Sequence, residues 1–384
     1  MVEKSVEKNS IEAWLAGLGA PSADRDYKPG HARMQALLQD MPLRHPKLRI
    51  RIAGTNGKGS TAFMLGAALQ ANGLKVGLYT SPHIHHFNER IRINGHALAD
   101  SRLLALMPAI ISKAKAINAS YFEVATALAL SSFSTAEVDV EILEAGVGAR
   151  LDATTAVPAD MALLTPVALD HQAWLGETLG EIAAEKAYIF DACRWQISAD
   201  QADIVRQKID KIYPDVQYMS ALFGKLLLRM NGEHQQQNAA LALAAVEALQ
   251  TGGWIINVHA AQQAIAQTIV PGRLQKVQHG RQCFWLDAAH NRHAIEVLLP
   301  GLQAMPPFDA VFVFTREDRD LRDVLPLLKS LNGRLISGMA SDVADAVYSS
   351  LQQALENECS HENGTYLVLG SFLTLAAAEN WLKE

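Results

Sequence analysis

Residues 52–61 read IAGTNGKGST, a segment whose residue types suit the binding of phosphate groups. It contains three glycines, Gly54, Gly57 and Gly59. Because they lack side chains, the backbone can approach an anion closely and turn its N–H groups toward it. Lys58 adds a positive charge, and Ser60 and Thr61 add hydroxyl groups at a predicted helix start, where the helix dipole favours negative charge.

The elements on either side of this loop support that interpretation. The apolar run at 48–53 predicts a buried strand, and residues 61–73 predict a helix. Strand, glycine loop and helix together form a phosphate-binding arrangement. The spacing differs from G-x-x-x-x-G-K-[ST], because Gly59 separates Lys58 from Ser60. A glycine-rich turn without a ligand is the alternative, and the flanking strand and helix favour the phosphate loop.

Polar residues also follow other predicted strands, at the edge where open α/β sheets bind ligands. Ser81 follows one strand, Glu144 lies near the end of a second, and Asp170-His171 follow a third. The Glu144 carboxylate suits Mg2+, which takes oxygen ligands and bridges protein to phosphates, whereas an ion pair at the sheet end is the alternative. His171 could complete a metal shell with Ser81 and Glu144, although a lone histidine is more often structural.

Other charged residues have plainer interpretations when the residues are taken alone. Asp152 is expected in an exposed turn, where it could bind polar groups of a substrate. Lys186 follows Glu185 in a predicted helix and is expected to be a solvated charge. His85 and His86 are expected to lie in a solvated connection.

The second part of the chain adds three motifs, PGR at 271–273, DAAHN at 287–291 and REDRD at 316–320. Arg273 could bind a phosphate, because an arginine stabilises the charge that develops on a phosphoryl group in transfer. DAAHN lies between a predicted strand and a predicted helix, again at a ligand-binding edge. The residues alone therefore predict a two-domain enzyme that depends on magnesium and a nucleotide, and they name no substrate.

Strand-like and helix-like segments alternate from residue 48 onward, which is typical of a doubly wound α/β sheet. The alternation restarts after Pro271-Gly272. We predict an N-terminal α/β domain at 1–271 and a smaller C-terminal α/β domain at 272–384. The predicted helices include 100–118, 121–136, 177–190, 234–253 and 341–356.

Composition excludes several classes of protein. The net charge of −6 argues against a nucleic-acid surface, and no apolar run is long enough to cross a bilayer. The charged residues at 1–10 lack a signal-peptide core, so a cytoplasmic location is expected. The three cysteines are too far apart for a disulfide framework or a zinc site: Cys193, Cys283 and Cys359. We expect a monomer with small-molecule partners, and no nucleic acid or membrane.

Taken together, the motifs resemble the bifunctional dihydrofolate synthase/folylpolyglutamate synthase family of the Mur ligase superfamily. The resemblance runs from about residue 11 to the end of the chain. Ten motifs carry it in order: GTNGKGST, SPHI-x-x-F-x-ERI-x-ING, YFE-x-AT, ILEAGVGARLDAT, LDH-x-x-x-LG-x-T, IA-x-EKA-x-I, Q-x-x-NAA-x-A, PGR, D-x-AHN and GSF. It implies an N-terminal P-loop ATPase domain and a smaller Rossmann-like C-terminal domain.

The resemblance also implies a reaction. ATP would phosphorylate a carboxylate of the pterin substrate, and the amino group of L-glutamate would attack the acyl phosphate to form an amide and release phosphate. The acceptors would be 7,8-dihydropteroate, giving dihydrofolate, and reduced folates, which would gain further glutamates. ATP would be the co-substrate and Mg2+ the cofactor, because magnesium and cationic residues stabilise the charge at each step.

Site roles are implied residue by residue. The ATP site would comprise Asn56, Gly57, Lys58, Gly59, Ser60, Thr61, Asn238, Arg273, Asp287 and His290. Magnesium would be bound by Ser81, Glu144, His171 and Lys186, the last as a carbamate. The catalytic residues would be Lys58, His171, Lys186 and Arg273. The pterin pocket would comprise Gly30, Tyr121, Phe122, Glu123, Leu151, Asp152 and Ala153, with the Phe122 ring stacking on the substrate.

The chain departs from the family's pattern at four positions. His31 replaces a leucine and Thr155 an asparagine, both in segments that the resemblance assigns to the pterin pocket. Arg292 replaces a proline after DAAHN, and Arg319 replaces the lysine of an Asp-Lys-Asp motif. Two alternatives follow: a Mur-type amide ligase for a different carboxylate acceptor, or a nucleotide-binding protein without catalysis. The retained Lys58, Glu144, His171 and Lys186 favour an active ligase.

Overall fold

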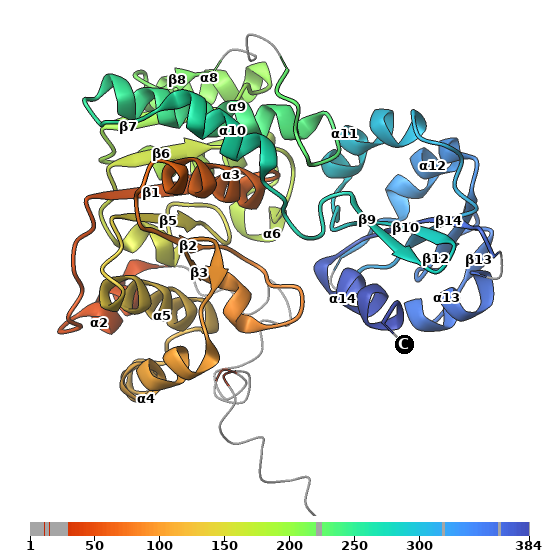
Figure 1. Cartoon of the computed structure of the whole chain (residues 1–384), viewed down its shortest axis with the longest axis horizontal. Helices are drawn as coiled ribbons and strands as arrows, with labels where there is room; N and C mark the ends of the chain where they lie inside the picture. The colour runs from red at the N-terminus through yellow and green to blue at the C-terminus, as the bar shows by residue number, and fades with distance from the viewer. Residues whose placement is uncertain are drawn as a thin grey trace, which may run out of the picture. The chain divides into compact units, whose positions relative to one another are not determined.

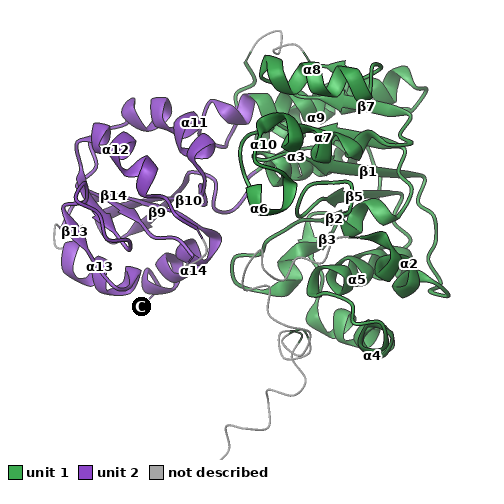
Figure 2. Ribbon diagram, turned by 180° about the vertical axis from the view of Figure 1, so that it is seen from behind, with its two compact units in different colours: residues 1–227, 237–268 green, residues 228–236, 269–384 purple. Residues whose placement is uncertain are grey.

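The computed structural model describes residues 11, 15, 30–219, 225–316, 319–359 and 362–383. These residues form two compact units, coloured separately in Figure 2. Unit 1 lies within residues 1–227 and 237–268, and unit 2 within residues 228–236 and 269–384.

Unit 1 is built on an eight-stranded sheet in the order β4-β3-β2-β5-β1-β6-β7-β8. Strands β2, β5, β1, β6, β7 and β8 are parallel, and β3 and β4 add an antiparallel edge. The strands are β1 (Leu48–Ala53), β2 (Val76–Tyr79), β3 (Ile91–Ile93), β4 (His96–Ala97), β5 (Val140–Glu144), β6 (Met161–Leu164), β7 (Trp195–Ser198) and β8 (Gln217–Tyr218).

Helices connect the parallel strands, as crossovers between parallel neighbours require. They are α2 (His31–Leu38), α3 (Lys58–Ala71), α4 (Asp100–Ala116), α5 (Tyr121–Thr135), α6 (Gln172–Leu175), α7 (Leu179–Ala187), α8 (Asp203–Ile212), α9 (His234–Thr251) and α10 (Val258–Gln267). Helix α3 packs on β2 and β5 through Gly66, and α10 packs on α3 (Figure 1). Helices α4 and α5 share one buried cluster, and α7 and α8 share another.

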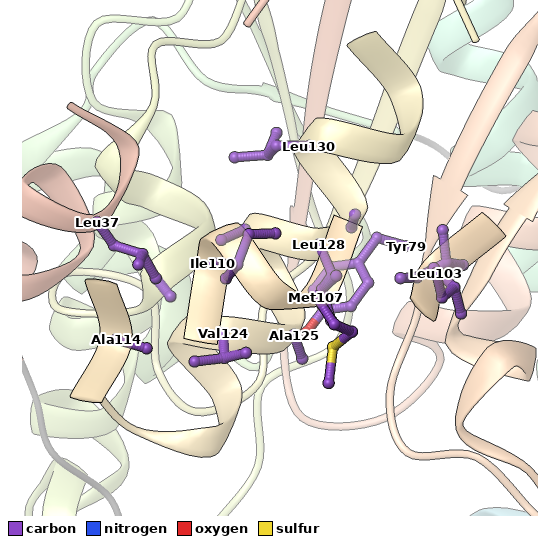
Figure 3. Packing of buried hydrophobic residues seen from close by; sticks show 14 of the residues in the cluster. Leu37, Tyr79, Leu103, Met107, Ile110, Ala114, Val124, Ala125, Leu128 and Leu130 are labelled. Carbon is purple, nitrogen blue, oxygen red and sulfur yellow. The ribbon is translucent and has the colours of Figure 1, made fainter. Parts of the chain in front are cut away.

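The central strands of unit 1 are buried along their whole length. All residues of β1, β2, β5 and β6 are buried, as expected for parallel strands covered on both faces. Figure 3 shows how Leu103, Met107 and Ile110 of α4 pack with α5 and Tyr79. This rigid core fixes the ends of the strands, from which the candidate site residues extend.

Two arginines interrupt the apolar character of β1. Arg49 forms a buried ion pair with Glu141 of β5, with 2.6 Å between Nε and Oε2. Arg51 donates from one guanidinium nitrogen to the carbonyl oxygen of Asp191 at 2.8 Å. Burial of a charge is tolerated when the charge is paired and hydrogen-bonded, as it is for Arg49. Arg51 has only hydrogen bonds from its terminal nitrogens to carbonyl oxygens and to Cys193 Sγ, and its buried Nε has no partner among the described residues.

Unit 2 contains a six-stranded sheet in the order β13-β12-β11-β14-β10-β9. Its strands are parallel except for β9 at one edge, which pairs antiparallel to β10. The strands are β9 (Gln275–His279), β10 (Gln282–Asp287), β11 (Ala310–Val313), β12 (Arg334–Ser337), β13 (Ala346–Val347) and β14 (Thr365–Leu369). The helices are α11 (Arg292–Gln303), α12 (Leu325–Leu328), α13 (Leu351–Glu358) and α14 (Phe372–Trp381).

The predicted α/β class is confirmed by two sheets rich in parallel strands. The helix predicted at 341–356 is wrong in its first part, because β13 occupies Ala346–Val347 and α13 begins at Leu351. Ser350 starts that helix, since its hydroxyl oxygen accepts from the backbone N–H of Gln353. The functional domain boundary at 271/272 stays a prediction. No helix in the described part of the chain is long and apolar enough to cross a membrane.

Candidate active site

The glycine loop after β1 has a backbone that only glycine adopts easily at two positions. Gly54 has a φ of 136°, and a Cβ there would lie 1.9 Å from Thr165 Oγ1. Gly57 has a φ of 94° and is the residue before α3, which begins at Lys58 rather than at the predicted residue 61. A Cβ on Gly57 would lie 2.2 Å from Asn238 Oδ1, so Asn238 of α9 borders the loop.

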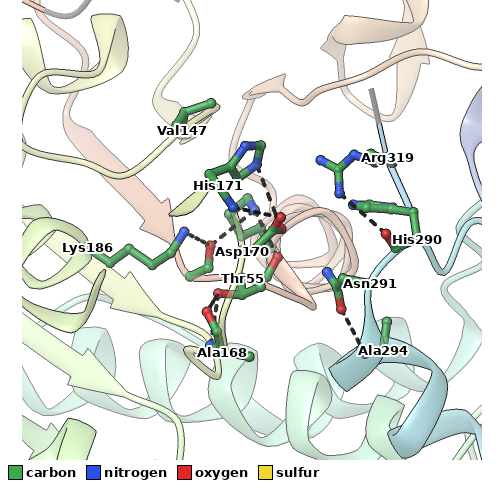
Figure 4. A network of polar contacts seen from close by, with 12 residues as sticks. Thr55, Val147, Ala168, Asp170, His171, Lys186, His290, Asn291, Ala294 and Arg319 are labelled. Carbon is green, nitrogen blue, oxygen red and sulfur yellow. Dashed lines mark hydrogen bonds and ion pairs between the residues drawn. The ribbon is translucent and has the colours of Figure 1, made fainter. Parts of the chain in front are cut away.

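Thr55 ties this loop to the segment after β6. Its hydroxyl donates to the Ala168 carbonyl oxygen and accepts from the Ala168 N–H, both at 3.0 Å (Figure 4). Its backbone N–H also donates to Pro166 O at 3.0 Å. The motif analysis did not single out Thr55, because its partners lie more than a hundred residues away along the chain.

The lysine and the hydroxyl groups of the loop are positioned to bind an anion. Lys58 Nζ donates to Gly54 O at 3.2 Å and to Thr55 O at 3.1 Å. Ser60 Oγ and Thr61 Oγ1 are buried, and no protein partner is found for either among the described residues. A buried hydroxyl without a partner is costly, so two at a helix start indicate a site that a ligand completes.

Glu144 and Ser81 meet beside this loop, as the sequence predicts. Glu144 ends β5, is almost completely buried, and accepts a hydrogen bond from the Ser81 N–H at 2.9 Å through Oε2. Its two carboxylate oxygens lie 3.6 and 3.8 Å from where a Cβ on Gly59 would stand. These are ordinary van der Waals distances, and they place the Glu144 carboxylate directly beside the start of α3.

His171 lies in a neighbouring loop, where it has the unusual φ of 51° and precedes α6. Its backbone N–H donates to Asp170 Oδ1 at 2.9 Å, and its ring Nε2 lies 3.7 Å from Asp170 Oδ2 (Figure 4). Asp170 thus fixes the backbone of His171 and lies close to its ring. The sequence indicated the pair of residues but not this arrangement.

Lys186 is buried, so its interpretation as a solvated charge is wrong. Its Nζ donates to the carbonyl oxygen of Gly54 at 2.9 Å, the same oxygen that Lys58 contacts. Burial, together with the positive charge of Lys58, lowers the pKa of Lys186 to about 7. The periodicity of α7 could have revealed this, because Ile182, Ala183 and Lys186 occupy one buried face.

The donor set suits magnesium bound together with a nucleotide. Among the described residues, no three His, Cys, Asp or Glu side chains form a cluster that could hold a metal ion. Mg2+ is commonly bound by one or two protein oxygens together with phosphates and water. Glu144 and the partnerless hydroxyl of Ser60 supply oxygens of that kind at the phosphate loop.

A second group of predicted residues surrounds the glycine turn after β5. The ring of Phe122 lies directly against Gly146, where a Cβ would stand 2.8 Å from Phe122 Cζ. Tyr79 lies behind Phe122, with 5.9 Å between ring centroids. Glu123 caps the start of α5 by accepting from the Ser120 N–H, and it accepts from Arg33 Nε at 3.2 Å.

Asp152 is buried, so the expected exposed turn is wrong at this position. Its carboxylate accepts from the backbone N–H groups of Gly146, Val147 and Thr154, and from the Thr154 hydroxyl. These bonds make Asp152 a support for the glycine turn. Leu151 is 37% exposed, and its carbonyl oxygen accepts from the Gly30 N–H at 3.2 Å. Ala153 is buried at the start of a short 3-10 turn, η4 (Ala153–Ala156).

Tyr121 belongs to a neighbouring aromatic cluster. The Arg90 guanidinium lies 5.5 Å from the Tyr121 ring centroid and donates through Nε to His83 Nδ1 at 2.9 Å. Glu89, which sequence reasoning did not single out, accepts backbone hydrogen bonds from Ile84, His85 and His86. One carboxylate thereby fixes the segment after Ser81 that the sequence predicted to be a solvated connection.

Unit 2 holds the remaining predicted residues. Arg273 lies over the Phe372 ring, 5.0 Å from its centroid, and its charge lowers the pKa of His234 toward 4, after the larger effect of burial. The buried Asp287 accepts from the N–H groups of Leu274 and Ala289, which fixes the turn after β10. His290 follows in that turn, and its carbonyl oxygen accepts from Arg319 (Figure 4). Asp318 lies outside the described residues.

Unit 1 has a P-loop nucleotide-binding fold, because a strand, a glycine loop with two buried hydroxyl groups that lack partners among the described residues, and a helix follow one another. The same chain continues into a second α/β unit. The chain is 34% identical over 359 residues to the dihydrofolate synthase/folylpolyglutamate synthase of Escherichia coli K12, covering 85% of this chain and 84% of that protein. The chain therefore belongs to the dihydrofolate synthase/folylpolyglutamate synthase family. No protein-family model matches it.

Solved structures agree with this assignment. The structure of E. coli FolC in complex with DHPP and ADP superposes with a TM-score of 0.82 at 29% identity, covering 98% of each chain. Mycobacterium tuberculosis folylpolyglutamate synthase complexed with ADP and AMPPCP gives a TM-score of 0.80 at 26% identity, covering 93% of this chain and 96% of that one. The similarity thus extends through both units.

Proposed function

We propose that this protein ligates L-glutamate to 7,8-dihydropteroate to give dihydrofolate, and adds further glutamates to reduced folates, with ATP as co-substrate. One observation carries the proposal: Lys58, Glu144 and the buried Lys186 converge on a phosphate loop in a member of this family. The complexes of relatives with DHPP, ADP and AMPPCP support it.

The nucleotide roles follow from the loop. Its backbone, with Asn56, Gly57 and Gly59, would surround the ATP phosphates, while Lys58 would neutralise their charge. The Ser60 and Thr61 hydroxyls would find in the nucleotide or its ion the partners that the protein does not give them. Asn238 would contact the adenosine part, and the ATP site would also include three residues of unit 2: Arg273, Asp287 and His290.

Magnesium would be held by Ser81, Glu144, His171 and a carbamate on Lys186. When bound, the ion would stabilise the charge that builds up on the transferring phosphate. The low pKa of Lys186 supports the carbamate, because a pKa of about 7 leaves much of the amine neutral at physiological pH. The neutral Nζ attacks the carbon of CO2 and loses a proton to solvent, which gives an anionic oxygen ligand in place of a cation.

Catalysis would proceed in two steps. The acceptor carboxylate attacks the γ-phosphate of ATP to give an acyl phosphate and ADP, and the glutamate amine then displaces phosphate. Lys58 and Arg273 would stabilise the negative charge in the first step. Phe122 would stack on the flat ring of the acceptor, with Gly30, Tyr121, Glu123, Leu151, Asp152 and Ala153 shaping the pocket around it.

The test is direct. Purified protein is mixed with ATP, Mg2+, dihydropteroate and L-glutamate, and ADP and dihydrofolate are measured together. Equal amounts of both products are expected, and omission of dihydropteroate or of L-glutamate should abolish the formation of dihydrofolate. The absence of dihydrofolate with no ADP above background would contradict the proposal.

Amide ligation to a different carboxylate acceptor is the second candidate. The contact between His31 and Thr155 favours it, because both are departures within the predicted acceptor pocket. Turnover with another carboxylate and none with dihydropteroate or reduced folates would establish this candidate over the first. ATP binding without turnover on any acceptor would instead indicate a nucleotide-binding protein.

The carbamate is tested separately from activity. Intact-protein mass measurement in bicarbonate under native conditions should show an added mass of about 44 Da, the mass of CO2 that the Nζ attack adds. Lys186→Met should lose that addition, while Lys208→Met, which removes an ordinary lysine of α8, should retain it. An unmodified wild-type mass with full ligase activity would show that Lys186 acts as an amine.

A further inference from the structure

The two departures from the family's pattern in the acceptor segments are in direct contact. His31 Nε2 lies 3.0 Å from Thr155 Oγ1, although the residues are separated by 124 positions in the sequence. His31 is the first residue of α2 and half-buried, and Thr155 is buried within η4. A leucine at 31 could not make this hydrogen bond, so the contact belongs to the residues that this chain has at both positions.

The direction of the hydrogen bond follows from the partners of Thr155. Its hydroxyl also lies 2.5 Å from Ala149 O and 2.8 Å from Asp152 O, and carbonyl oxygens only accept. A hydroxyl has one hydrogen, which goes to one of these carbonyl groups. Thr155 Oγ1 therefore accepts from His31 Nε2–H, and the histidine carries its proton on that nitrogen.

The bond reaches the turn that shapes the predicted pocket. Thr155 Oγ1 links His31 to the carbonyl groups of residues 149 and 152, which flank Leu151. The neighbouring Gly30 N–H donates to Leu151 O at 3.2 Å. Two consecutive residues at the start of α2 thus hold one turn, and a shift of α2 would move it.

An ion pair also ties α2 to the other side of the predicted acceptor pocket. Arg33 Nε lies 3.2 Å from Glu123 Oε2 at the start of α5, next to Phe122. The other oxygen of that buried carboxylate, Oε1, has no hydrogen-bond partner among the described residues. Helix α2 therefore spans from the 149–155 turn to the residues expected to contact the acceptor ring.

We propose that His31 and Thr155 form a coupled positioning pair that sets the affinity of this enzyme for its pterin acceptor and leaves ATP binding unchanged. The inference rests on the proposed function, because it takes the pocket beside Phe122 to be the acceptor site. The pair acts through the position of the turn at 149–155, and neither residue is required to take part in the chemistry.

The test is a double-mutant cycle with matched conservative variants. His31→Leu and Thr155→Val remove one partner each, and the double variant removes both. His31→Gln keeps a donor at the position of Nε2, and Thr155→Ser keeps the hydroxyl. His96→Leu, at an exposed histidine of β4, is the control for loss of an imidazole.

We expect each disruptive single variant to raise the KM for dihydropteroate about fivefold, the effect of losing one hydrogen bond of ordinary strength. The double variant should show no larger effect than the worse single variant, because the two changes remove the same contact. The KM for ATP should stay within about twofold in every variant. The conservative variants and His96→Leu should match wild type.

The outcomes separate this inference from the proposed function. If wild-type enzyme makes dihydrofolate and the disruptive variants keep its acceptor KM, the pair has no positioning role. Independent, additive losses in the double variant would also overturn it, as would equal changes in acceptor and ATP KM. If wild-type enzyme makes no dihydrofolate, both proposals fail. Thermal melts confirm that each variant is folded at the assay temperature.

Discussion

The proposed nucleotide region and the proposed acceptor region of unit 1 are built in different ways. At the nucleotide region, Ser60 and Thr61 keep buried hydroxyls without protein partners, and two lysines share the Gly54 carbonyl oxygen. At the acceptor region, the polar side chains of Asp152 and Thr155 are hydrogen-bonded within the protein itself. The first region offers cations and hydroxyl groups to a charged ligand, whereas the side chains of the second are held in place and give it a defined shape. Changes in the first should therefore lower kcat, and changes in the second should raise acceptor KM.

The largest effect is expected from Lys58→Met, which removes the loop's cation while keeping most of its length. We expect kcat to fall by about 10³-fold, as when a group that stabilises transition-state charge is lost. Steady-state ADP formation with saturating acceptor measures it. Lys75→Met, which alters a lysine outside the loop, is the control. A fall in kcat of less than about tenfold would show that the loop's charge is not required.

Arg273→Ala extends the comparison to unit 2. The side chain would stabilise charge that develops during phosphoryl transfer, so we expect kcat to fall by about 10²-fold while ATP affinity changes by less than about threefold. Rapid-mix assays and ATP titration measure the two quantities. Arg281→Ala, which removes an exposed arginine paired with Glu362, is the control. An equal loss in turnover and ATP binding would assign Arg273 to binding alone.

The depressed pKa of the buried Lys186 makes the free energy of unfolding depend on pH. Burial and Lys58 lower the pKa of Lys186 to about 7, while in the unfolded chain the pKa of a lysine is about 10.4. Between these values the unfolded chain binds more protons, so the folded state gains stability as pH rises and loses it as pH falls toward 7. Below pH 7 both states are protonated and this contribution is constant.

Urea unfolding of metal-free protein in bicarbonate-free buffer measures this effect. From pH 7.5 to 8.5, the free energy of unfolding of wild type should rise by about 1 kcal/mol relative to Lys186→Met. The comparison with the variant cancels the other titrating groups. Parallel pH profiles for the two proteins would show that the folded state does not depress the pKa of Lys186.

The sequence was sufficient to predict features that depend on residues close together in the chain, such as the phosphate loop. Gly54, Gly57 and Lys58 lie within five residues of one another, and strand, loop and helix follow in order, so both the loop and its ligand could be recognised. Long-range packing could not be recognised in this way. The hydrogen bond of Lys186 to Gly54 joins residues 132 positions apart, although the periodicity of α7 does indicate that Lys186 is buried. The burial of Asp152 has a local cause, because its carboxylate accepts from N–H groups of its own turn, and no motif indicated that conformation. Charge alone suggested exposure for both side chains, and both are buried.

A smaller effect than those at Lys58 and Arg273 is expected at Phe122, in the proposed acceptor region. Its ring lies against Gly146 and beside Tyr79, so it is a fixed surface and not a source of charge. Phe122→Leu keeps the apolar character and removes the flat face, and we expect the KM for dihydropteroate to rise about tenfold with kcat within about threefold. Phe63→Leu, at a phenylalanine of α3 stacked with Arg92, is the matched control. A loss confined to kcat would mean that Phe122 positions the reacting carboxylate, and the division between a region for charge and a region for shape would not hold.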